Sequence, residues 1–204
     1  MNMPTLESHP NAVIKRIAAR CHLWAAACQT RLAALLTVLA TTLCLLSPPA
    51  HALEPGQAVP DVDLPGTSLA PKLSALQGKL VYVDFWASWC GPCRQSFPWM
   101  NEMQRKYAAR GLQIVAINVD AKRKDADEFL QQTPAGFALA FDAKGESARR
   151  LQVKGMPTSM LIGADGKLLW VHQGFRLDER EALEARLVAA LAVTQAAQSK
   201  AKTP

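Results

Sequence analysis

The sequence predicts an α/β fold in which a central mixed β-sheet is flanked by helices on both faces. Two apolar runs, residues 79–86 (KLVYVDFW) and 112–119 (LQIVAINV), are typical of strands buried on both sides. A helical pattern follows each run, and this alternation favours parallel strands. A later pair of short strands turns about Asp165-Gly166, which adds an antiparallel hairpin and makes the sheet mixed.

Local signals place the other elements along the chain. Residues 53–78 are rich in Pro, Gly and Asp and should form an N-terminal extension, with short strands near 58–64 and a helical turn near 73–76. Further helices are expected at 93–109, 125–132, 146–153 and 177–196, and further strands at 137–141, 158–162 and 167–172. Pro98 should kink the first of these helices, and Gly111 should end it.

The N-terminal segment has the organisation of a secretory signal peptide. Arg31 precedes an apolar run at 32–46, which ends at two prolines and an Ala-His-Ala cleavage site at 50–52. The run is shorter than the ~20 residues that span a bilayer comfortably. We therefore expect removal on export, with an uncleaved membrane anchor as the alternative. The expected organisation is a signal peptide at 1–52, one folded domain at 53–197 and a flexible tail at 198–204.

The charge pattern predicts no nucleic-acid partner. The chain has a net charge of +6, but four basic residues and one acidic residue precede residue 32, so the remainder has a mild surplus of three positive charges. The longest basic run, residues 122–124, is followed directly by Asp125, Asp127 and Glu128. Such a pattern is typical of a solvated helix start rather than of a phosphate-binding surface.

The cysteines point to redox chemistry. Of the five, three lie in the expected signal peptide, and the rest of the chain keeps only Cys90 and Cys93, in a C-x-x-C motif. One close pair closes a very small loop and adds little to stability, so the pair is more plausibly there to react. It falls where a helix follows the first buried strand, and a helix N-terminus favours a thiolate. We expect Cys90 to attack and the more buried Cys93 to resolve the mixed disulfide, with Gly91 and Pro92 forming a small accessible surface between them.

A metal site is the competing interpretation of the cysteine pair. Zinc needs four protein ligands, or three with an open position. After residue 52 the chain offers only His172 and no third cysteine. Met100 and Met103 could suggest copper, but methionines at helical spacing are far more often core residues. We therefore expect no metal, and no cofactor other than the redox-active Cys90–Cys93 disulfide.

Residues 83–94 (VDFWASWCGPCR) resemble the thioredoxin active-site segment almost residue for residue. Pro98 falls where that family has its helix-kinking proline, and residues 155–158 (GMPT) resemble its cis-proline loop. The extension before residue 79, and the additional helix and strand between 120 and 155, are similar to the TlpA/ResA-type exported reductases. The resemblance implies a thioredoxin fold with an N-terminal extension and an inserted helix and strand before the cis-proline loop.

Asp84 is a carboxylate inside an apolar strand, which is costly unless it is paired or functional. A structural hydrogen bond is one explanation. The other is a desolvated acid with a raised pKa that takes the proton of Cys93 when the mixed disulfide resolves. The matching aspartate of thioredoxins supports the second explanation. The family's lysine on the next strand is replaced by Ala116, so Asp84 should lack a cationic neighbour and hold its proton more tightly.

The resemblance also implies a substrate-binding surface around the cysteines. A cis bond between Met156 and Pro157 would leave the backbone of Met156 beside the pair, ready to pair with an extended substrate segment. Trp89 is expected to contact substrate, whereas Trp86 is expected to pack in the core.

The predicted function is an enzyme that reduces disulfides in partner proteins. The signal peptide predicts that this enzyme is located in the periplasm. There a membrane-embedded thiol donor is expected to keep the Cys90–Cys93 pair reduced. Contact with the membrane is expected only through the N-terminal segment, if that segment stays uncleaved. For this family, apocytochrome c is a natural substrate candidate. The same pair could instead act as an oxidant or isomerase. A redox-inert or copper-delivering binding module is a further alternative, but it would need ligands beyond the two cysteines. A peroxidase is less favoured, because Ala87 stands three residues before Cys90, where a peroxidase motif has threonine.

Overall fold

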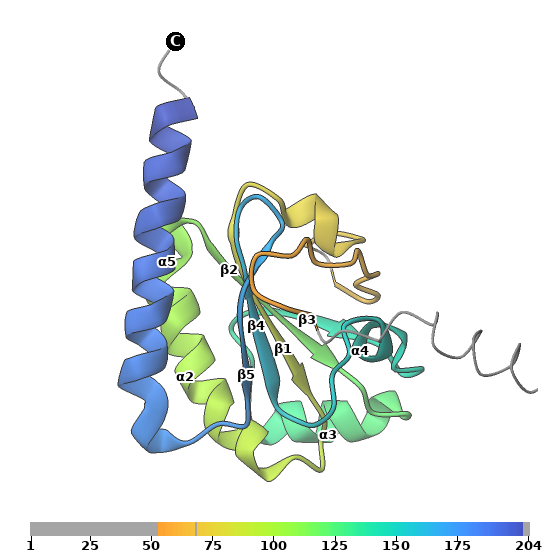
Figure 1. Ribbon diagram of the computed structural model, residues 1–204. Coiled ribbons are helices and arrows are strands. Elements are labelled where there is room, and N and C mark those ends of the chain that lie inside the picture. Colours follow the sequence, from red (N-terminus) through yellow and green to blue (C-terminus); the bar gives the residue numbers. More distant parts are fainter. Residues whose placement is uncertain (1–52, 68, 202–204) are drawn as a thin grey trace, which may run out of the picture. The chain divides into compact units, whose positions relative to one another are not determined.

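The structure, a computed structural model, describes residues 53–67 and 69–201 (Figure 1). The expected signal peptide and residues 202–204 of the expected tail lie outside the described residues and stay predictions, whereas residues 198–201 of that tail are helical. Everything described belongs to one compact unit, His51–Pro204.

A five-stranded mixed sheet forms the centre of this unit, in the order β3-β2-β1-β4-β5. Its strands are β1 (Leu80–Trp86), β2 (Leu112–Asn118), β3 (Ala138–Phe141), β4 (Thr158–Ile162) and β5 (Leu168–Gln173). The first three run parallel to one another, whereas β4 pairs antiparallel with β1 and with β5. The mixed sheet expected from the sequence is therefore confirmed.

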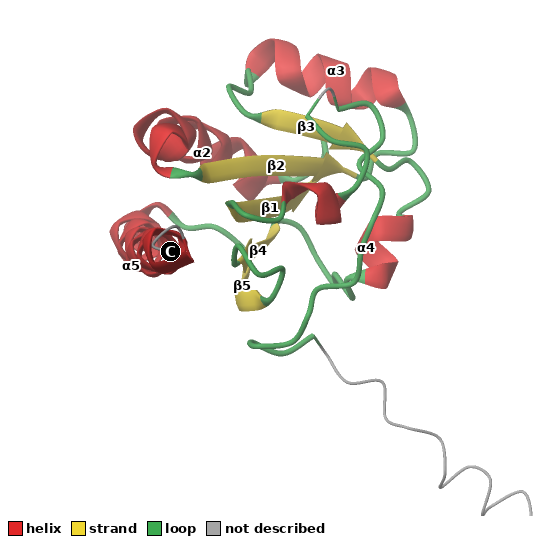
Figure 2. Cartoon of the chain, turned by 90° about the horizontal axis from the view of Figure 1, so that it is seen from above, coloured by secondary structure: helices red, strands yellow, loops and turns green. Residues whose placement is uncertain are grey.

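Helices cover both faces of the sheet. They are α2 (Gly91–Tyr107), α3 (Arg123–Gln132), α4 (Glu146–Arg150) and α5 (Arg180–Ala201). Figure 2 shows α2 and α5 together on one face and α4 on the other. The basic run at 122–124 does begin a solvated helix, because Arg123 and Lys124 pair with Asp127 and Glu128 one turn later.

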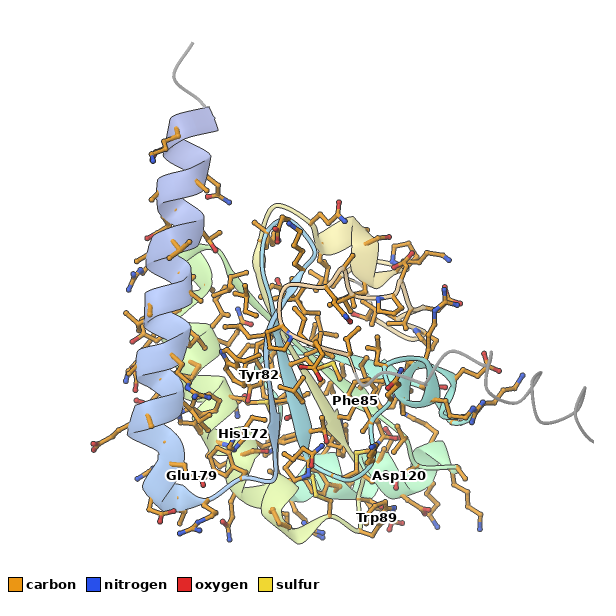
Figure 3. The ribbon with its side chains drawn as sticks, viewed as in Figure 1. Tyr82, Phe85, Trp89, Asp120, His172 and Glu179 are labelled. Carbon is orange, nitrogen blue, oxygen red and sulfur yellow. A yellow bond between two sulfur atoms is a disulfide. The ribbon has the colours of Figure 1, made fainter. Side chains whose placement is uncertain are left out.

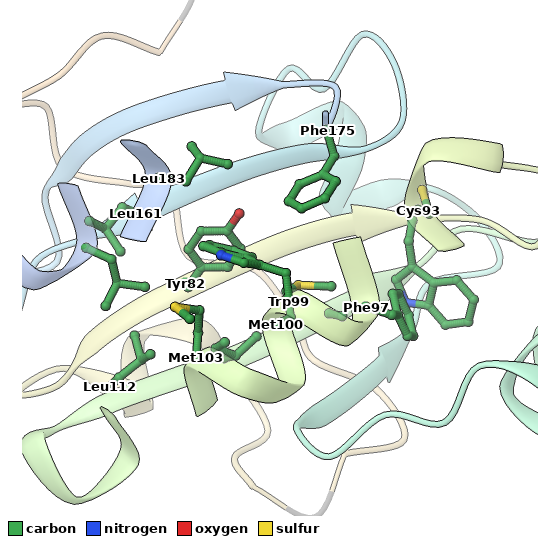
Figure 4. Packing of buried hydrophobic residues seen from close by; sticks show 14 of the residues in the cluster. Tyr82, Cys93, Phe97, Trp99, Met100, Met103, Leu112, Leu161, Phe175 and Leu183 are labelled. Carbon is green, nitrogen blue, oxygen red and sulfur yellow. The ribbon is translucent and has the colours of Figure 1, made fainter. Parts of the chain in front are cut away.

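Strand β1 divides the core into two halves by the alternation of its side chains. Leu80, Tyr82 and Trp86 pack under α2 and α5, while the intervening Val81, Val83 and Phe85 pack on the opposite side. Figure 4 shows the first half, to which α2 contributes Phe97, Met100 and Met103. Both methionines are fully buried, as expected for core residues.

Some boundaries differ from the expected ones for local reasons. The extension contains a 3-10 turn at Leu73–Leu76 as expected, but only isolated bridges, Ala58 to Lys167 and Asp63 to Lys72, replace its short strands. Helix α4 stops at Arg150, before the expected end, because Gln152 turns the chain with a φ of 57°.

The C-terminal helix extends further than expected. A 3-10 turn at Leu177–Glu179 precedes α5, which continues to Ala201 instead of ending at residue 196. Its last turns are held to the body of the domain, since the side-chain amides of Gln195 and Gln198 donate to the backbone oxygens of Arg110 and Gly78.

Candidate active site

Cys90 and Cys93 form a disulfide at the N-terminus of α2, with their Cα atoms 5.3 Å apart. Cys90 is the N-cap residue: its backbone is extended, and its Sγ accepts a hydrogen bond from the backbone N–H of Cys93 at 3.2 Å. Pro92 fits the first turn, where an N–H would have no helical partner. In the reduced protein, the same N–H and the helix dipole favour a thiolate at Cys90.

The two cysteines differ in exposure in the expected order. Cys93 is fully buried, and Cys90 retains 3% exposure. The accessible rim around them consists of Trp89, which is 71% exposed, together with the exposed Gly91 and Pro92. A partner must therefore reach the sulfur of Cys90 across this rim.

The loop that leads to Cys90 is anchored by Asp120, at the carboxyl end of β2. The two carboxylate oxygens accept hydrogen bonds from the backbone N–H of Ser88 at 2.8 Å and from its hydroxyl at 3.0 Å. Asn118 donates a further bond to the same carboxylate at 2.7 Å. Sequence reasoning missed Asp120 and Ser88, although the position of Asp120 just after a buried strand was a usable signal.

Asp84 lies in the middle of β1 and is fully buried. Burial raises its pKa from the ordinary 3.8 to about 7, and a hydrogen bond from Ser159 partly opposes this rise. The Ser159 hydroxyl donates to Oδ1 at 2.6 Å, while Oδ2 is buried without a hydrogen-bond partner among the described residues. On its other side Asp84 is paired with Ala116, the residue expected to leave it without a cationic neighbour.

The structural hydrogen bond offered as one explanation of Asp84 is present, whereas its role as proton acceptor for Cys93 stays a prediction. One carboxylate oxygen of Asp84 makes this bond, and the other is buried with no hydrogen-bond partner in residues 53–67 and 69–201. Sequence reasoning missed Ser159, which reaches Asp84 only because β4 pairs with β1 in this register. Tyr82 lies two residues before Asp84, on the same face of β1. Burial is the larger cause that raises the pKa of Tyr82, and the nearby charge of Asp84 is the smaller one.

The loop before β4 has the expected conformation. The Met156–Pro157 bond is cis. Met156 is half-buried and packs against the cluster that contains both cysteines, whereas Pro157 is buried. The loop is fixed by hydrogen bonds from the Thr158 hydroxyl to the oxygen of Gly155 and from the Gly174 N–H to the oxygen of Pro157.

The remaining expectations concern core residues, metals and membranes. Trp86 is fully buried and packs against Phe97 and Phe129, as predicted. Residues 53–67 and 69–201 contain no group of three or more His, Cys, Asp or Glu side chains arranged to hold a metal ion. Within these same residues, no helix combines the length and apolar character needed to cross a membrane.

Comparison with known proteins assigns the family. The model of the Redoxin family matches residues 54–187. The chain is 34% identical over 131 residues to the thiol-disulfide oxidoreductase ResA of Bacillus thuringiensis subsp. konkukian, a match that covers 63% of this chain and 75% of the relative. It is 32% identical over 124 residues to ResA of Oceanobacillus iheyensis, covering 58% of this chain and 65% of that protein.

Solved structures agree with this assignment. A crystal structure of a candidate thiol:disulfide interchange protein DsbE from Chlorobium tepidum is 58% identical, with a TM-score of 0.66, and covers 68% of this chain and 99% of that one. A solution structure from Bacteroides thetaiotaomicron, at 23% identity and a TM-score of 0.61, shares the fold and covers 69% of this chain and 91% of that one. Together with the disulfide at the start of α2, these matches show that the chain belongs to the redoxin family and is a ResA-like thiol–disulfide oxidoreductase of the thioredoxin superfamily.

Proposed function

We propose that this protein is an exported reductase of protein disulfides, in which Cys90, Cys93 and Asp84 carry the reaction. The observation that supports this best is the combination of a capped cysteine pair with a buried carboxyl that has no cation beside it. The pair supplies two electrons, and the carboxyl supplies a proton acceptor that water cannot reach directly.

The reaction proceeds in two exchanges. The Cys90 thiolate attacks one sulfur of the substrate disulfide, which forms a mixed disulfide and releases the first substrate thiolate. Cys93 then loses its proton to Asp84, and its thiolate attacks the Sγ of Cys90. The second substrate thiolate leaves, both substrate sulfurs are reduced, and Cys90–Cys93 is oxidised.

The proton affinity of Asp84 suits this second exchange. A general base is most effective when its pKa lies near the operating pH. Burial raises the pKa of Asp84 to about 7, so near neutral pH the carboxyl can both accept the proton of Cys93 and release it afterwards. A purely structural acid has no need of such a value.

Substrate recognition follows from the rim of the site. Trp89 projects beside Cys90 with most of its surface exposed, and Gly91 and Pro92 leave space for an incoming chain. An extended segment that pairs with the backbone of Met156 would bring its cysteine to the Sγ of Cys90. Protein disulfides in extended segments are therefore the proposed substrate class, and the haem-attachment C-x-x-C-H segment of an apocytochrome c is one candidate.

The proposed location is the periplasm. This location is supported by the signal-like sequence at residues 1–52. If that segment stays uncleaved, it would anchor the protein to the inner membrane. The periplasm is kept oxidising kinetically, so a reducing pair persists there only if electrons are supplied. We therefore propose a membrane-embedded thiol donor as the second partner.

The reduction potential of the Cys90–Cys93 pair tests the direction of electron flow. A reductase should have a value near the ~−270 mV of thioredoxin, whereas an oxidant should lie near ~−120 mV. Acid quenching of intact cells followed by thiol labelling should find the pair largely reduced, and oxidised when membrane thiol donors are removed. A high potential together with a fully oxidised pair in normal cells would assign the protein to the oxidant alternative.

A further inference from the structure

We propose that Tyr82 and Ser159 act in series to hold Oδ1 of Asp84 as a fixed hydrogen-bond acceptor, so that Oδ2 is the oxygen that takes up the proton of Cys93. This inference rests on the proposed role of Asp84 as proton acceptor. It adds two positioning residues, Tyr82 and Ser159, and it assigns different tasks to the two carboxylate oxygens.

The sheet places these three side chains on one face. Tyr82 and Asp84 are two residues apart on β1, so both side chains are on the side that α2 and α5 cover. Ser159 on β4 is directly opposite Asp84 in the antiparallel pair and therefore shares this face. All three residues are buried, with exposures of 1%, 0% and 3%. Their polar atoms must find hydrogen-bond partners within the protein rather than in bulk water.

The order of donors and acceptors follows from the chemistry of the three groups. The Ser159 hydroxyl donates to Oδ1 of Asp84 at 2.6 Å. The Tyr82 phenol shares a hydrogen bond with the same serine side chain. Burial raises the pKa of Tyr82 above its ordinary value, so the phenol keeps its proton and is the donor. The hydrogen of Ser159 is engaged at Asp84, and its oxygen accepts from Tyr82.

This order makes the two oxygens of Asp84 unequal. Oδ1 receives the hydrogen of Ser159, and a hydroxyl that itself accepts a hydrogen bond is the stronger donor. Oδ2 is buried and has no hydrogen-bond partner in residues 53–67 and 69–201. An arriving proton would displace Ser159 at Oδ1, whereas it would displace no described group at Oδ2. The proton therefore binds Oδ2, and Oδ1 accepts from Ser159 in both states of the carboxyl.

The described elements around Asp84 place no other charge against it. Its partner on β2 is Ala116, and Cys93, the proton donor itself, is the titratable group among the buried residues of α2. The residues of α5 that join this core are leucines. Strand β5 contributes His172, which is opposite Ser159 rather than Asp84 and faces a carboxylate that precedes α5. The pKa of Asp84 is accordingly raised by burial and lowered by the Ser159 hydrogen bond.

Tyr82 lies inside the domain, away from the rim that a partner protein would cover. Its ring packs against those of Trp99 and Trp170, with centroids 5.7 and 5.8 Å away. Figure 4 shows Tyr82 beside Trp99, and Figure 3 shows that Trp89 lies apart from Tyr82. Removal of the phenol hydroxyl therefore leaves the rim unchanged, and its effect on the reaction reports on the buried site.

The second exchange balances in this arrangement. The S–H bond of Cys93 breaks, and an O–H bond forms at Oδ2 of Asp84. The Cys93 thiolate attacks the Sγ of Cys90, and the substrate thiolate leaves with the electron pair of the broken S–S bond. Tyr82 and Ser159 keep their own protons throughout.

Carboxyl-carbon NMR of the reduced protein measures the pKa of Asp84 without any substrate. Ser159→Ala removes a hydrogen bond to the charged form, and we expect it to raise this pKa by about one unit. Ser159→Thr keeps the hydroxyl and should keep the original value. Tyr82→Phe should raise the pKa by less, because Ser159 still donates but is no longer polarised by the phenol. In the Ser159→Ala background, Tyr82→Phe should have no further effect, since the phenol acts only through the serine.

The hydroxyl proton of Ser159 reports which oxygen of Asp84 carries the added proton. This hydroxyl is buried and hydrogen-bonded, so its signal should be resolved in proton NMR. We expect the signal to keep the downfield position of a hydrogen-bonded proton at pH values above and below the midpoint of Asp84. Loss of that hydrogen bond on protonation would place the proton on Oδ1 and overturn the assignment.

Resolution of a mixed disulfide with a coloured aromatic thiol, followed in stopped flow, provides the functional readout. The pH at which the rate is half-maximal should move upward in Ser159→Ala by the same amount as the pKa, because the base must be ionised to accept the proton. Two matched controls each remove a hydroxyl that donates to a different carboxylate: Ser147→Ala at Asp142, and Tyr107→Phe at Glu184. Both controls should leave the pKa of Asp84 and the pH profile unchanged.

The outcomes separate this inference from the function on which it rests. If Ser159→Ala leaves the pKa of Asp84 unchanged, the serine does not control the carboxyl and the inference fails. If Tyr82→Phe shifts the pKa equally with and without Ser159, the two residues do not act in series. If instead Asp84→Asn resolves mixed disulfides at the original rate at every pH, Asp84 is not the proton acceptor and the proposed mechanism itself fails.

Discussion

Asp84 and Ala116 are direct partners across β1 and β2, so the buried carboxyl meets a methyl group where thioredoxins have a lysine. Ser159, its partner on the other side, donates a single hydrogen bond. One uncharged donor compensates only part of the cost of burying the charge, and the pKa of Asp84 therefore lies near 7.

The first prediction concerns stability. Because folding raises the pKa of Asp84 from its ordinary 3.8 to about 7, the folded chain binds more protons than the unfolded chain between these pH values. The free energy of unfolding should fall as the pH rises through this window, by roughly 4 kcal/mol in total. Asp84→Asn should remove this loss and be more stable than the original protein near pH ~8. Urea unfolding of both oxidised proteins across the pH range provides the measurement.

The comparison has an internal control, because below pH ~4 the carboxyl is protonated in both states and the two proteins should differ little. An Asp84→Asn protein that keeps the full pH slope of the original would show that other groups cause the dependence.

The second prediction concerns the roles of the thiols. Cys93→Ser should accumulate stable mixed disulfides through Cys90, since the attacking residue remains and the resolving residue is gone. Cys90→Ser is the matched control and should trap far less, because Cys93 is fully buried. Alkylation of the reduced protein near neutral pH, followed by mass spectrometry, should modify Cys90 first. Preferential labelling of Cys93 would reverse the assignment.

Local patterns were sufficient to predict most of the fold. Continuous apolar runs located β1 and β2, the Asp165-Gly166 turn located the hairpin, and the glycine and proline signals bounded α2. The cysteine pair and the unusual Asp84 also stand out in the sequence, because each departs from what a stable core needs.

The partners of these residues could not be predicted, because they depend on long-range register. Ser159 is 75 residues from Asp84 in the chain, and Asp120 is 32 residues from Ser88. Nothing local distinguishes Ser159 from an ordinary strand serine until β4 is placed beside β1. The full length of α5 could not be predicted for the same reason. Gln198 in its last turns donates a hydrogen bond to the backbone oxygen of Gly78, which is 120 residues away in the chain.

The third prediction concerns the anchor of the active-site loop. Asp120→Ala should leave the N–H and hydroxyl of the half-buried Ser88 without their acceptor, which should lower the free energy of unfolding by about 1–2 kcal/mol. The reaction of Cys90 with disulfides should slow as well, because the loop that positions it loses its support. Urea unfolding and single-turnover kinetics measure the two effects.

Glu128→Ala serves as the control for this variant, because Glu128 is an exposed carboxylate on α3 that forms only a surface ion pair with Lys124 among the described residues. Its stability should change by less than about 0.5 kcal/mol. If Asp120→Ala is as mild as this control, the hydrogen bonds to Ser88 do not hold the loop.

The last prediction concerns Trp89. Its side chain is 71% exposed, so Trp89→Ala should change the free energy of unfolding by less than about 0.5 kcal/mol. The same variant should reduce insulin, an arbitrary protein disulfide, several-fold more slowly, because an exposed aromatic beside Cys90 contributes contact area only to a partner large enough to cover it. Reaction with glutathione disulfide should stay near the original rate, since this small molecule needs only the sulfur of Cys90. Equal losses with both substrates would show that Trp89 acts on the cysteine chemistry itself, and no loss with either would remove it from the proposed recognition surface.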